Sequence, residues 1–218
     1  MITKEELAAR FVHASENVIA TEDKLTEIDS QFGDADHGLT MVKIANAIKG
    51  AIDESDGGIQ EMLDDVAMAV MVLNGGSAVP LWNTWLDGLQ EVAPEGVEVD
   101  TEQLKAMFAH ALEELADMSG AEVGDKTMMD AVIPASEAIA AYSGDEAGLF
   151  EIAAQRAQRI QRILFQNLVV QKATEKKLLV RQMLEQYRWH AFLGVLHKHK
   201  GKLCITKNKE ETNDEKIY

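Results

Sequence analysis

Cysteine, proline, aromatic side chains and long apolar runs are all scarce in this 218-residue chain. The single cysteine, Cys204, excludes an internal disulfide framework and fits a reducing cytoplasm. No apolar run approaches the roughly 18 residues that a membrane span needs, so we expect no membrane segment. The N-terminus opens directly into a charged helical pattern, so we expect no signal peptide and a cytoplasmic location.

Basic side chains are also scarce, but only in the first 150 residues, which hold 7 basic and 30 acidic side chains. This balance argues against nucleic acid as a partner, because binding to its backbone needs clustered Lys and Arg. Residues 151–218 reverse the balance, with 14 basic and 7 acidic side chains. A basic tail on an acidic body, a separate partner-binding module and an altered reading frame all fit this reversal.

Apolar residues recur at helical spacing through most of the chain, whereas alternating β-branched stretches are missing. Thr3 followed by Glu6 predicts a capping box at the first helix. The three prolines, Pro80, Pro94 and Pro134, fit helix starts or loops. We therefore predict an all-α fold, an antiparallel helical bundle.

The first segment whose side chains suggest a functional site is a Gly-containing loop that carries Asp29, Asp34 and Asp36. Three carboxylates held close together repel one another unless a cation neutralises them. Hard oxygen ligands on a loop suit Mg²⁺, which takes phosphate oxygens as further ligands. A solvated surface loop is the alternative, and the residues alone do not choose between the two.

His37 follows these aspartates at the start of the next predicted helix. It could be a metal ligand, a general base or a plain polar residue at a helix end. The backbone N–H groups of Gly38, Leu39 and Thr40 would be free there, and free amides at a helix start attract phosphate. A carboxylate loop that leads into such a helix start would make a coherent nucleotide site.

Two further segments contain glycines in suggestive places. Gly75-Gly76 in the stretch 74–81 permits close approach of a ligand, although a plain helix–helix turn explains it as well. In the stretch 120–130, we expect Asp125 to cap the following helix, with Lys126 in its first turn. Lys at that position opposes the helix dipole unless an anion lies nearby.

Taken in order, the three stretches resemble the nucleotide-binding L subunit of dihydroxyacetone kinases. The matching elements are Asp29-x4-Asp34-Ala35-Asp36-His37-Gly38, Gly75-Gly76-Ser77-Ala78-Val79-Pro80-Leu81 and Gly124-Asp125-Lys126-Thr127-Met128-Met129-Asp130.

The resemblance implies an antiparallel helical barrel with the nucleotide, ADP or ATP, at one end. Asp29, Asp34 and Asp36 would hold two Mg²⁺ ions that bridge the nucleotide phosphates. The helix start 37–40, with His37 among the catalytic residues, and the pair Ser77 and Ala78 would line phosphate and ribose. Met128 and the segment near Ser119 would flank the adenine.

The function that the resemblance implies is transfer of a phosphoryl group to dihydroxyacetone or a related short ketose, held by a K-type partner subunit. In the phosphotransferase-system branch of the family, a phosphohistidine protein rephosphorylates the bound nucleotide; other members use ATP. The alternative is a non-catalytic regulatory or binding subunit that has lost turnover.

The C-terminal third departs from the family, because the segment that closes over the nucleotide is absent after Gln155. We predict a nucleotide-binding domain over 1–155, an atypical helical continuation over 156–197 and a flexible basic tail over 198–218. Shifting the codons of residues 176–182 by one nucleotide can regenerate a lid-like sequence, so a frame-shifted lid and a genuine alternative tail both remain open. The bulky apolar residues of the continuation would pack on the body or on a second copy in a homodimer.

Overall fold

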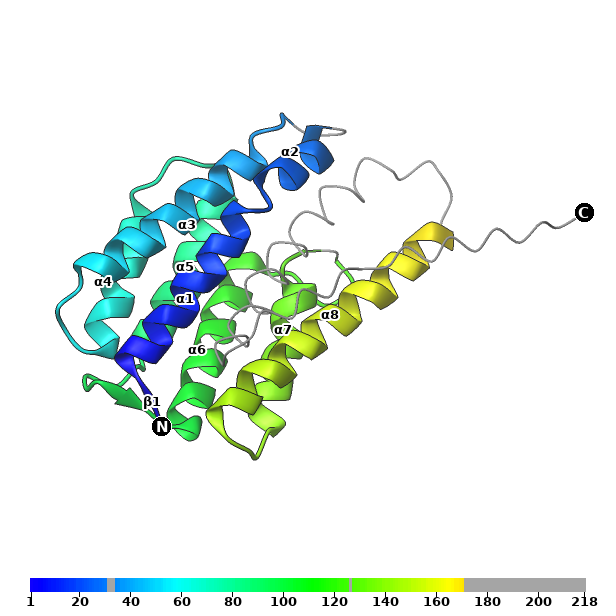
Figure 1. Ribbon diagram of the computed structural model, residues 1–218. Helices are drawn as coiled ribbons and strands as arrows, with labels where there is room; N and C mark the ends of the chain where they lie inside the picture. Colours follow the sequence, from blue (N-terminus) through cyan, green and yellow to red (C-terminus); the bar gives the residue numbers. More distant parts are fainter. Residues whose placement is uncertain (31–33, 126, 171–218) are drawn as a thin grey trace, which may run out of the picture.

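The structure, a computed structural model, describes residues 1–30, 34–125 and 127–170, and side chains as far as Arg159 with a gap at position 158 (Figure 1). Helices account for most of this part of the chain, which confirms the predicted all-α fold. They are α1 (Lys4–Ile19), α2 (Glu22–Ser30), α3 (His37–Glu54), α4 (Ile59–Met71), α5 (Ala78–Gln90), α6 (Thr101–Ser119), α7 (Met129–Ala141) and α8 (Glu146–Val170). Two short strands, β1 (Ile2–Thr3) and β2 (Glu98–Val99), pair antiparallel.

The helices form an up-and-down bundle in which most helices pack on their neighbours in sequence, and α1 packs on α3 (Figure 1). One end of the bundle, here called the strand end, holds β1, β2 and the connections 55–58 and 142–145. Lys4 fixes this end by donating through Nζ to the carbonyls of Ser55, at 2.8 Å, and Gly57, at 2.7 Å. The opposite end, here called the loop end, holds the described parts of three connections: 34–36, 72–77, and 120–128 without residue 126.

Two helices begin with reciprocal caps that their sequences specify. At α1, Thr3 Oγ1 accepts from the Glu6 N–H at 3.2 Å and the Glu6 carboxylate accepts from the Thr3 N–H at 3.4 Å, so the predicted capping box is confirmed. At α6, Asp100 and Gln103 form the same arrangement. Such caps satisfy amides that have no acceptor within the helix.

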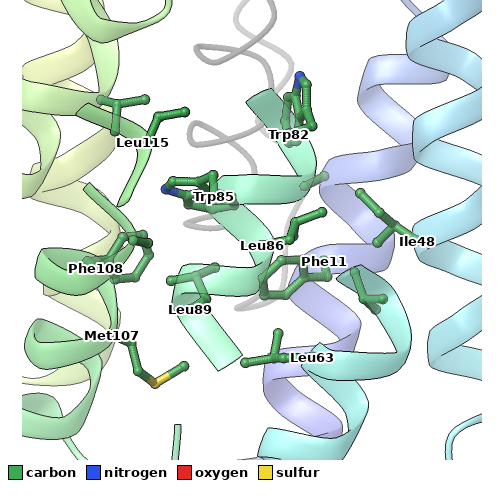
Figure 2. Packing of buried hydrophobic residues seen from close by; sticks show 14 of the residues in the cluster. Phe11, Ile48, Leu63, Trp82, Trp85, Leu86, Leu89, Met107, Phe108 and Leu115 are labelled. Atoms are coloured by element: carbon green, nitrogen blue, oxygen red, sulfur yellow. The ribbon is translucent and has the colours of Figure 1, made fainter. Parts of the chain in front are cut away.

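Aromatic side chains connect α5, α6 and α8 through the core. The Trp85 ring lies 6.0 Å from that of Phe108, which in turn lies 6.2 Å from that of Phe150, measured between centroids. Figure 2 shows Trp85 on the side of α5 that faces Phe108, while Leu86 lies toward α1. The helix α5 therefore packs through opposite faces, which ties the two halves of the bundle together.

The first and last helices meet through a buried cation. The guanidinium of Arg10 on α1 lies 4.8 Å from the centroid of the Phe150 ring on α8, and Arg10 is only 6% exposed. Burial lowers the pKa of Arg10 from its usual value, with the nearby Glu6 acting in the opposite direction. The contact joins the ends of the helical sequence and closes the bundle into a barrel.

The structure differs from the expectation at one proline, and it continues a helix across one predicted boundary. Pro134 was expected at a helix start or in a loop, but it lies buried inside α7. The prediction was wrong because core packing outweighs the loss of one helical hydrogen bond. The helix α8 continues without a break across the boundary predicted at 155/156, whereas the rest of the predicted continuation and the tail, 171–218, lie outside the described residues. None of the described helices is long and apolar enough to cross a membrane.

Candidate functional site

All three segments singled out from the sequence lie at the loop end of the barrel. The helices α3, α5 and α7 start at this end, and α4 and α6 finish at it (Figure 1). The alternating direction of the helices therefore brings together loops that are about 40 to 90 residues apart in sequence. The resulting site is built on helix ends, which a well-packed core holds in place.

The first segment brings three carboxylates together. Asp29 ends α2 and is 7% exposed, while Asp34 and Asp36 are exposed on the loop that follows. One oxygen from each of the three residues lies within 4.8 Å of the others. Residues 31–33 lie outside the described part of the chain. The predicted clustering of the aspartates is therefore present, and its donor set suits a hard divalent cation.

The electrostatics of this cluster favour a cation. The pKa of Asp36 is raised from its ordinary value, first by a hydrogen bond with Asp34, then by burial and by the charges of Asp34 and Asp29. Lys43 opposes these effects only in part. A carboxyl group whose pKa is raised by neighbouring carboxylates is one whose ionised form lacks a counterion. The residues present therefore fit Mg²⁺ by number, oxygen chemistry and charge.

The start of α3 adds backbone donors beside the carboxylates. The His37 N–H donates to Asp29 Oδ2 at 3.3 Å, which ties the helix start to the carboxylate cluster. The first intrahelical bond is donated by the Thr40 N–H to the Asp36 carbonyl at 2.9 Å, and the Asp36 side chain does not cap the helix. The amides of Gly38 and Leu39 thus precede the helical ladder, as an anion site requires.

Glycine at position 38 allows α3 to approach α2 closely. A Cβ at Gly38 would lie 2.2 Å from Thr26 Oγ1 and 2.5 Å from the Glu22 carbonyl oxygen. No side chain fits there without moving the backbone of α2. The glycine therefore sets the distance between the helix that carries Asp29 and the helix start that follows Asp36.

The second segment lies against the first. A Cβ at Gly75 would lie 2.6 Å from Thr40 Cγ2, so the loop 72–77 rests on the first turn of α3. Gly76 has a positive φ of 39°, and Ser77 is exposed and precedes α5 without a side-chain cap. Ala78 is buried. Of the predicted phosphate- and ribose-lining pair, only Ser77 therefore presents its side chain at the surface.

Val79, in the first turn of α5, is buried in the core. Its side chain is 6% exposed, and its Cγ2 lies 3.1 Å from the position that a Gly75 Cβ would take. The Val79 side chain therefore packs beneath the loop 72–77 and supports it from inside.

The third segment connects α6 to α7. Ser119 is half-buried, and its Oγ accepts from the Ala121 N–H at 3.3 Å, whereas Met128 is buried at 1% exposure. Asp125 does not cap α7 as expected, because its carboxylate instead accepts from the Glu122 N–H at 2.9 Å and closes a turn within the loop. Lys126 lies outside the described residues.

One functional candidate was missed at the sequence level. Asp130, in the first turn of α7, is 1% exposed, and its Oδ1 accepts from the Gly124 N–H at 2.5 Å. The signal was present, because an acidic residue in the first turn of a helix, shortly after a glycine loop, is placed to bind loop amides. The first two segments contact each other through Gly75 and Thr40. The third segment lies at the same end of the barrel because α6 finishes there and α7 starts there.

A separate open hollow of about 480 Å³ lies between α7 and α8 and is lined in part by Tyr142 and Arg156. Its lining comes from the second half of α7 and the first half of α8, so it lies toward the strand end. None of its lining residues belongs to the three segments. The hollow is therefore distinct from the carboxylate cluster.

Comparison with known proteins gives a family and several relatives. The family model described as the DAK2 domain matches residues 31–166. The ADP-binding subunit DhaL of the PEP-dependent dihydroxyacetone kinase of Escherichia coli (strain K12) is 30% identical over 128 residues, which are 56% of this chain and 60% of that subunit. A D-erythrulose kinase of Mycolicibacterium smegmatis is 33% identical over 135 residues, which are 60% of this chain and 23% of that enzyme. The match thus spans less than two thirds of either relative.

Among solved structures, the dihydroxyacetone kinase of C. freundii in complex with AMP-PNP and Mg²⁺ shares the fold, with a TM-score of 0.67. The sequence identity is 19%, and the match covers 88% of this chain and 33% of that kinase. The barrel therefore corresponds to one part of a larger enzyme.

Proposed function

Because the chain belongs to the DAK2 domain family, we propose that it is the nucleotide-binding subunit of a kinase for dihydroxyacetone or a related short ketose. The observation that carries this proposal is the carboxylate cluster at the loop end, where oxygens of Asp29, Asp34 and Asp36 lie within 4.8 Å of one another. The Escherichia coli relative is an ADP-binding subunit, and the relative from Mycolicibacterium smegmatis is a D-erythrulose kinase.

Each part of the site has a defined task in this proposal. Asp29, Asp34 and Asp36 hold two Mg²⁺ ions, and buried Asp29 keeps its place through the His37 amide. The amides at the start of α3 bind phosphate oxygens, and Ser77 lies beside the ribose. Bound Mg²⁺ neutralises the charge that spreads over the phosphoryl oxygens during transfer.

The protein contributes positioning and electrostatics and supplies no nucleophile. The acceptor is the ketose hydroxyl, held by a K-type partner subunit that docks at the loop end. The nucleotide stays on this chain, and a phosphohistidine protein of the phosphotransferase system restores its phosphoryl group. Direct use of ATP is the variant of this scheme in which nucleotide exchanges after each turnover.

A second candidate function is a binding or regulatory subunit without turnover. It is favoured by one sequence observation, the absence of the family's nucleotide-closing segment after Gln155. Such a subunit would still bind nucleotide and Mg²⁺ through the same carboxylates. Phosphoryl transfer to dihydroxyacetone, measured with and without a K-type partner, separates the two functions.

The nucleotide assignment is tested by calorimetry with ADP and Mg²⁺. We expect the wild-type chain to bind ADP only when Mg²⁺ is present, and Asp34→Ala and Asp36→Ala to abolish binding. Asp64→Ala, on the exposed face of α4, is the matched control and should bind as the wild type does. Unchanged binding in both loop variants would refute the metal assignment.

A further inference from the structure

The connection from Gly120 to Met128 has little apolar packing to hold its outer part. Positions 122–125 are all exposed. Within the loop, Asp125 closes a turn by accepting from the Glu122 N–H at 2.9 Å. Gly124 has a positive φ of 108°, a conformation that side-chain-bearing residues rarely adopt. The outer part of the loop therefore has a specific shape that must be held from elsewhere.

Asp130 supplies a connection from this outer part to the barrel. Its side chain is 1% exposed in the first turn of α7, and Oδ1 accepts from the Gly124 N–H at 2.5 Å. Burying a carboxylate is costly unless hydrogen bonds compensate, and bonds to a charged acceptor are among the strongest in proteins. A buried carboxylate at this place is thus retained at a cost and has a loop amide as a partner.

At the inner end of the loop, Thr127 and Met128 are held by hydrogen bonds to the start of α7 and by burial. Thr127 Oγ1 accepts from the Met129 N–H at 3.2 Å, and the Thr127 carbonyl accepts from the Asp130 N–H at 3.2 Å. Met128 and Met129 are both buried, at 1% and 0% exposure. The inner part of the loop is therefore fixed by the core, and Asp130 passes that order outward to Gly124.

We propose that Asp130 is a positioning residue that shapes the loop 120–128 for the base of the bound nucleotide. The inference rests on the proposed function, because the loop lies at the same end of the barrel as the carboxylate cluster and runs between Ser119 and Met128, the two residues that the family resemblance places beside the adenine. Asp130 touches neither metal nor phosphate in this scheme and acts through the Gly124 backbone. Its loss should therefore weaken recognition of the base and leave binding of the magnesium-bound phosphates intact.

The test compares two ligands that differ in the nucleoside. Calorimetry in the presence of Mg²⁺ measures the affinities of ADP and of inorganic tripolyphosphate, which has no base. For Asp130→Ala we expect ADP binding to weaken by about tenfold, the equivalent of about 1.4 kcal/mol. The variant should bind tripolyphosphate within about twofold of the wild-type affinity. A difference of that size is no larger than the deviation from additivity that independent sites commonly show. Asp130→Asn keeps an oxygen acceptor and should recover part of the ADP affinity.

The chain offers a matched control at its other end. The carboxylate of Asp145 accepts from the Gly148 N–H at 2.9 Å, the same type of bond at the strand end. Asp145→Ala should leave both affinities unchanged. Equal weakening of ADP and tripolyphosphate by Asp130→Ala would overturn the inference, since that result indicates general loss of structure, and so would unchanged ADP binding.

Hydrogen exchange of the metal-free chain gives a readout that does not depend on any ligand. We expect Asp130→Ala to accelerate amide exchange in the peptide that covers 120–128 and to leave the peptides of α3 and α4 unchanged. Unaltered exchange in 120–128 would overturn the positioning role. If the wild type binds neither ADP nor tripolyphosphate, the proposed function fails, while exchange still decides whether Asp130 holds the loop.

Discussion

Replacing Asp36 by Asn should stabilise the metal-free protein while destroying its ability to bind Mg²⁺ and ADP. The reason lies in the carboxylate cluster, where Asp36 shares a hydrogen bond with Asp34 and experiences the charges of Asp34 and Asp29. Asn is nearly isosteric with Asp, can still donate a hydrogen bond to Asp34 and carries no charge. The substitution therefore removes repulsion and keeps the local geometry.

The expected gain can be worked out from the geometry. The carboxylate oxygens lie no more than 4.8 Å apart, and two unit charges at that separation repel each other by about 0.9 kcal/mol in water. Screening at physiological salt, with a Debye length of about 8 Å, lowers this to about 0.5 kcal/mol for each pair. Removing the charge of Asp36 relieves two pairs and should raise the free energy of unfolding by about 1 kcal/mol. For a chain of this size, that corresponds to an increase in Tm of roughly 2–4 °C.

The pH dependence has a definite sign. The pKa of Asp36 is raised in the folded state, so the folded protein binds the Asp36 proton more tightly than the unfolded chain does. The repulsive penalty therefore appears as the pH rises through the folded-state pKa, and it is absent below the unfolded value of 3.8. The advantage of Asp36→Asn should be full at neutral pH and should vanish in acid.

Thermal unfolding in EDTA and in Mg²⁺ with ADP measures both halves of this prediction. In EDTA the variant should melt above the wild type. With ligand at about a hundred times its Kd, the wild type should gain about 2.7 kcal/mol and the variant should gain nothing. Asp64→Asn on α4 is the control for removing one charge from an acidic protein. A variant that melts below the wild type in EDTA would refute the electrostatic reasoning.

Three further predictions concern other parts of the barrel. Gly88→Ala should lower the free energy of unfolding by about 1–3 kcal/mol in a denaturant titration, because its Cβ would lie 2.7 Å from the α6 backbone. Gly75→Ala should weaken ADP binding in calorimetry, because a Cβ 2.6 Å from Thr40 Cγ2 pushes the loop 72–77 off the start of α3. The hydrogen bond to Glu91 raises the pKa of His110. The pair therefore stabilises the fold at pH values below the usual histidine pKa, and this stabilisation is lost as the pH rises through the folded-state pKa. Glu91→Gln should flatten that pH dependence in melting curves and lower the His110 pKa measured by NMR.

Sequence patterns predicted the fold class well because the helices carry their own signals. The Thr3–Glu6 pair defines a helix start by local hydrogen bonds alone, and the structure has both of them. Apolar periodicity likewise predicted helix through most of the chain, and helices make up most of the described residues. The place of Pro134 inside α7 could not be predicted locally, because proline disfavours a helix interior and its burial depends on the whole fold.

The candidate site was predictable as a set of residues but not as an arrangement. Clustering of the three aspartates follows from their closeness in sequence, although the structure places Asp29 in the last turn of α2 and only Asp34 and Asp36 on the loop. The contact between Gly75 and Thr40, by contrast, depends on how α3, α4 and α5 pack. The predicted role of Asp125 was wrong. A carboxylate there can accept a hydrogen bond either from the start of the next helix or from an amide of its own loop, and in the structure it accepts from the loop. The predicted C-terminal continuation beyond residue 170 stays a prediction.

The contact between Arg10 and Phe150 has a consequence for how the chain acquires its structure. The two residues stand near opposite ends of the described sequence, so their meeting carries a large loop-closure cost that neighbouring helices do not face. During synthesis, helix pairs such as α1–α3, α3–α4 and α5–α6 can assemble while the ribosome is still translating, but the contact of Arg10 with Phe150 must wait for α8. Until then the Arg10 guanidinium and the Phe108 ring lack the packing that Phe150 gives them. The nascent chain should therefore be most vulnerable to aggregation just before residue 150 leaves the exit tunnel.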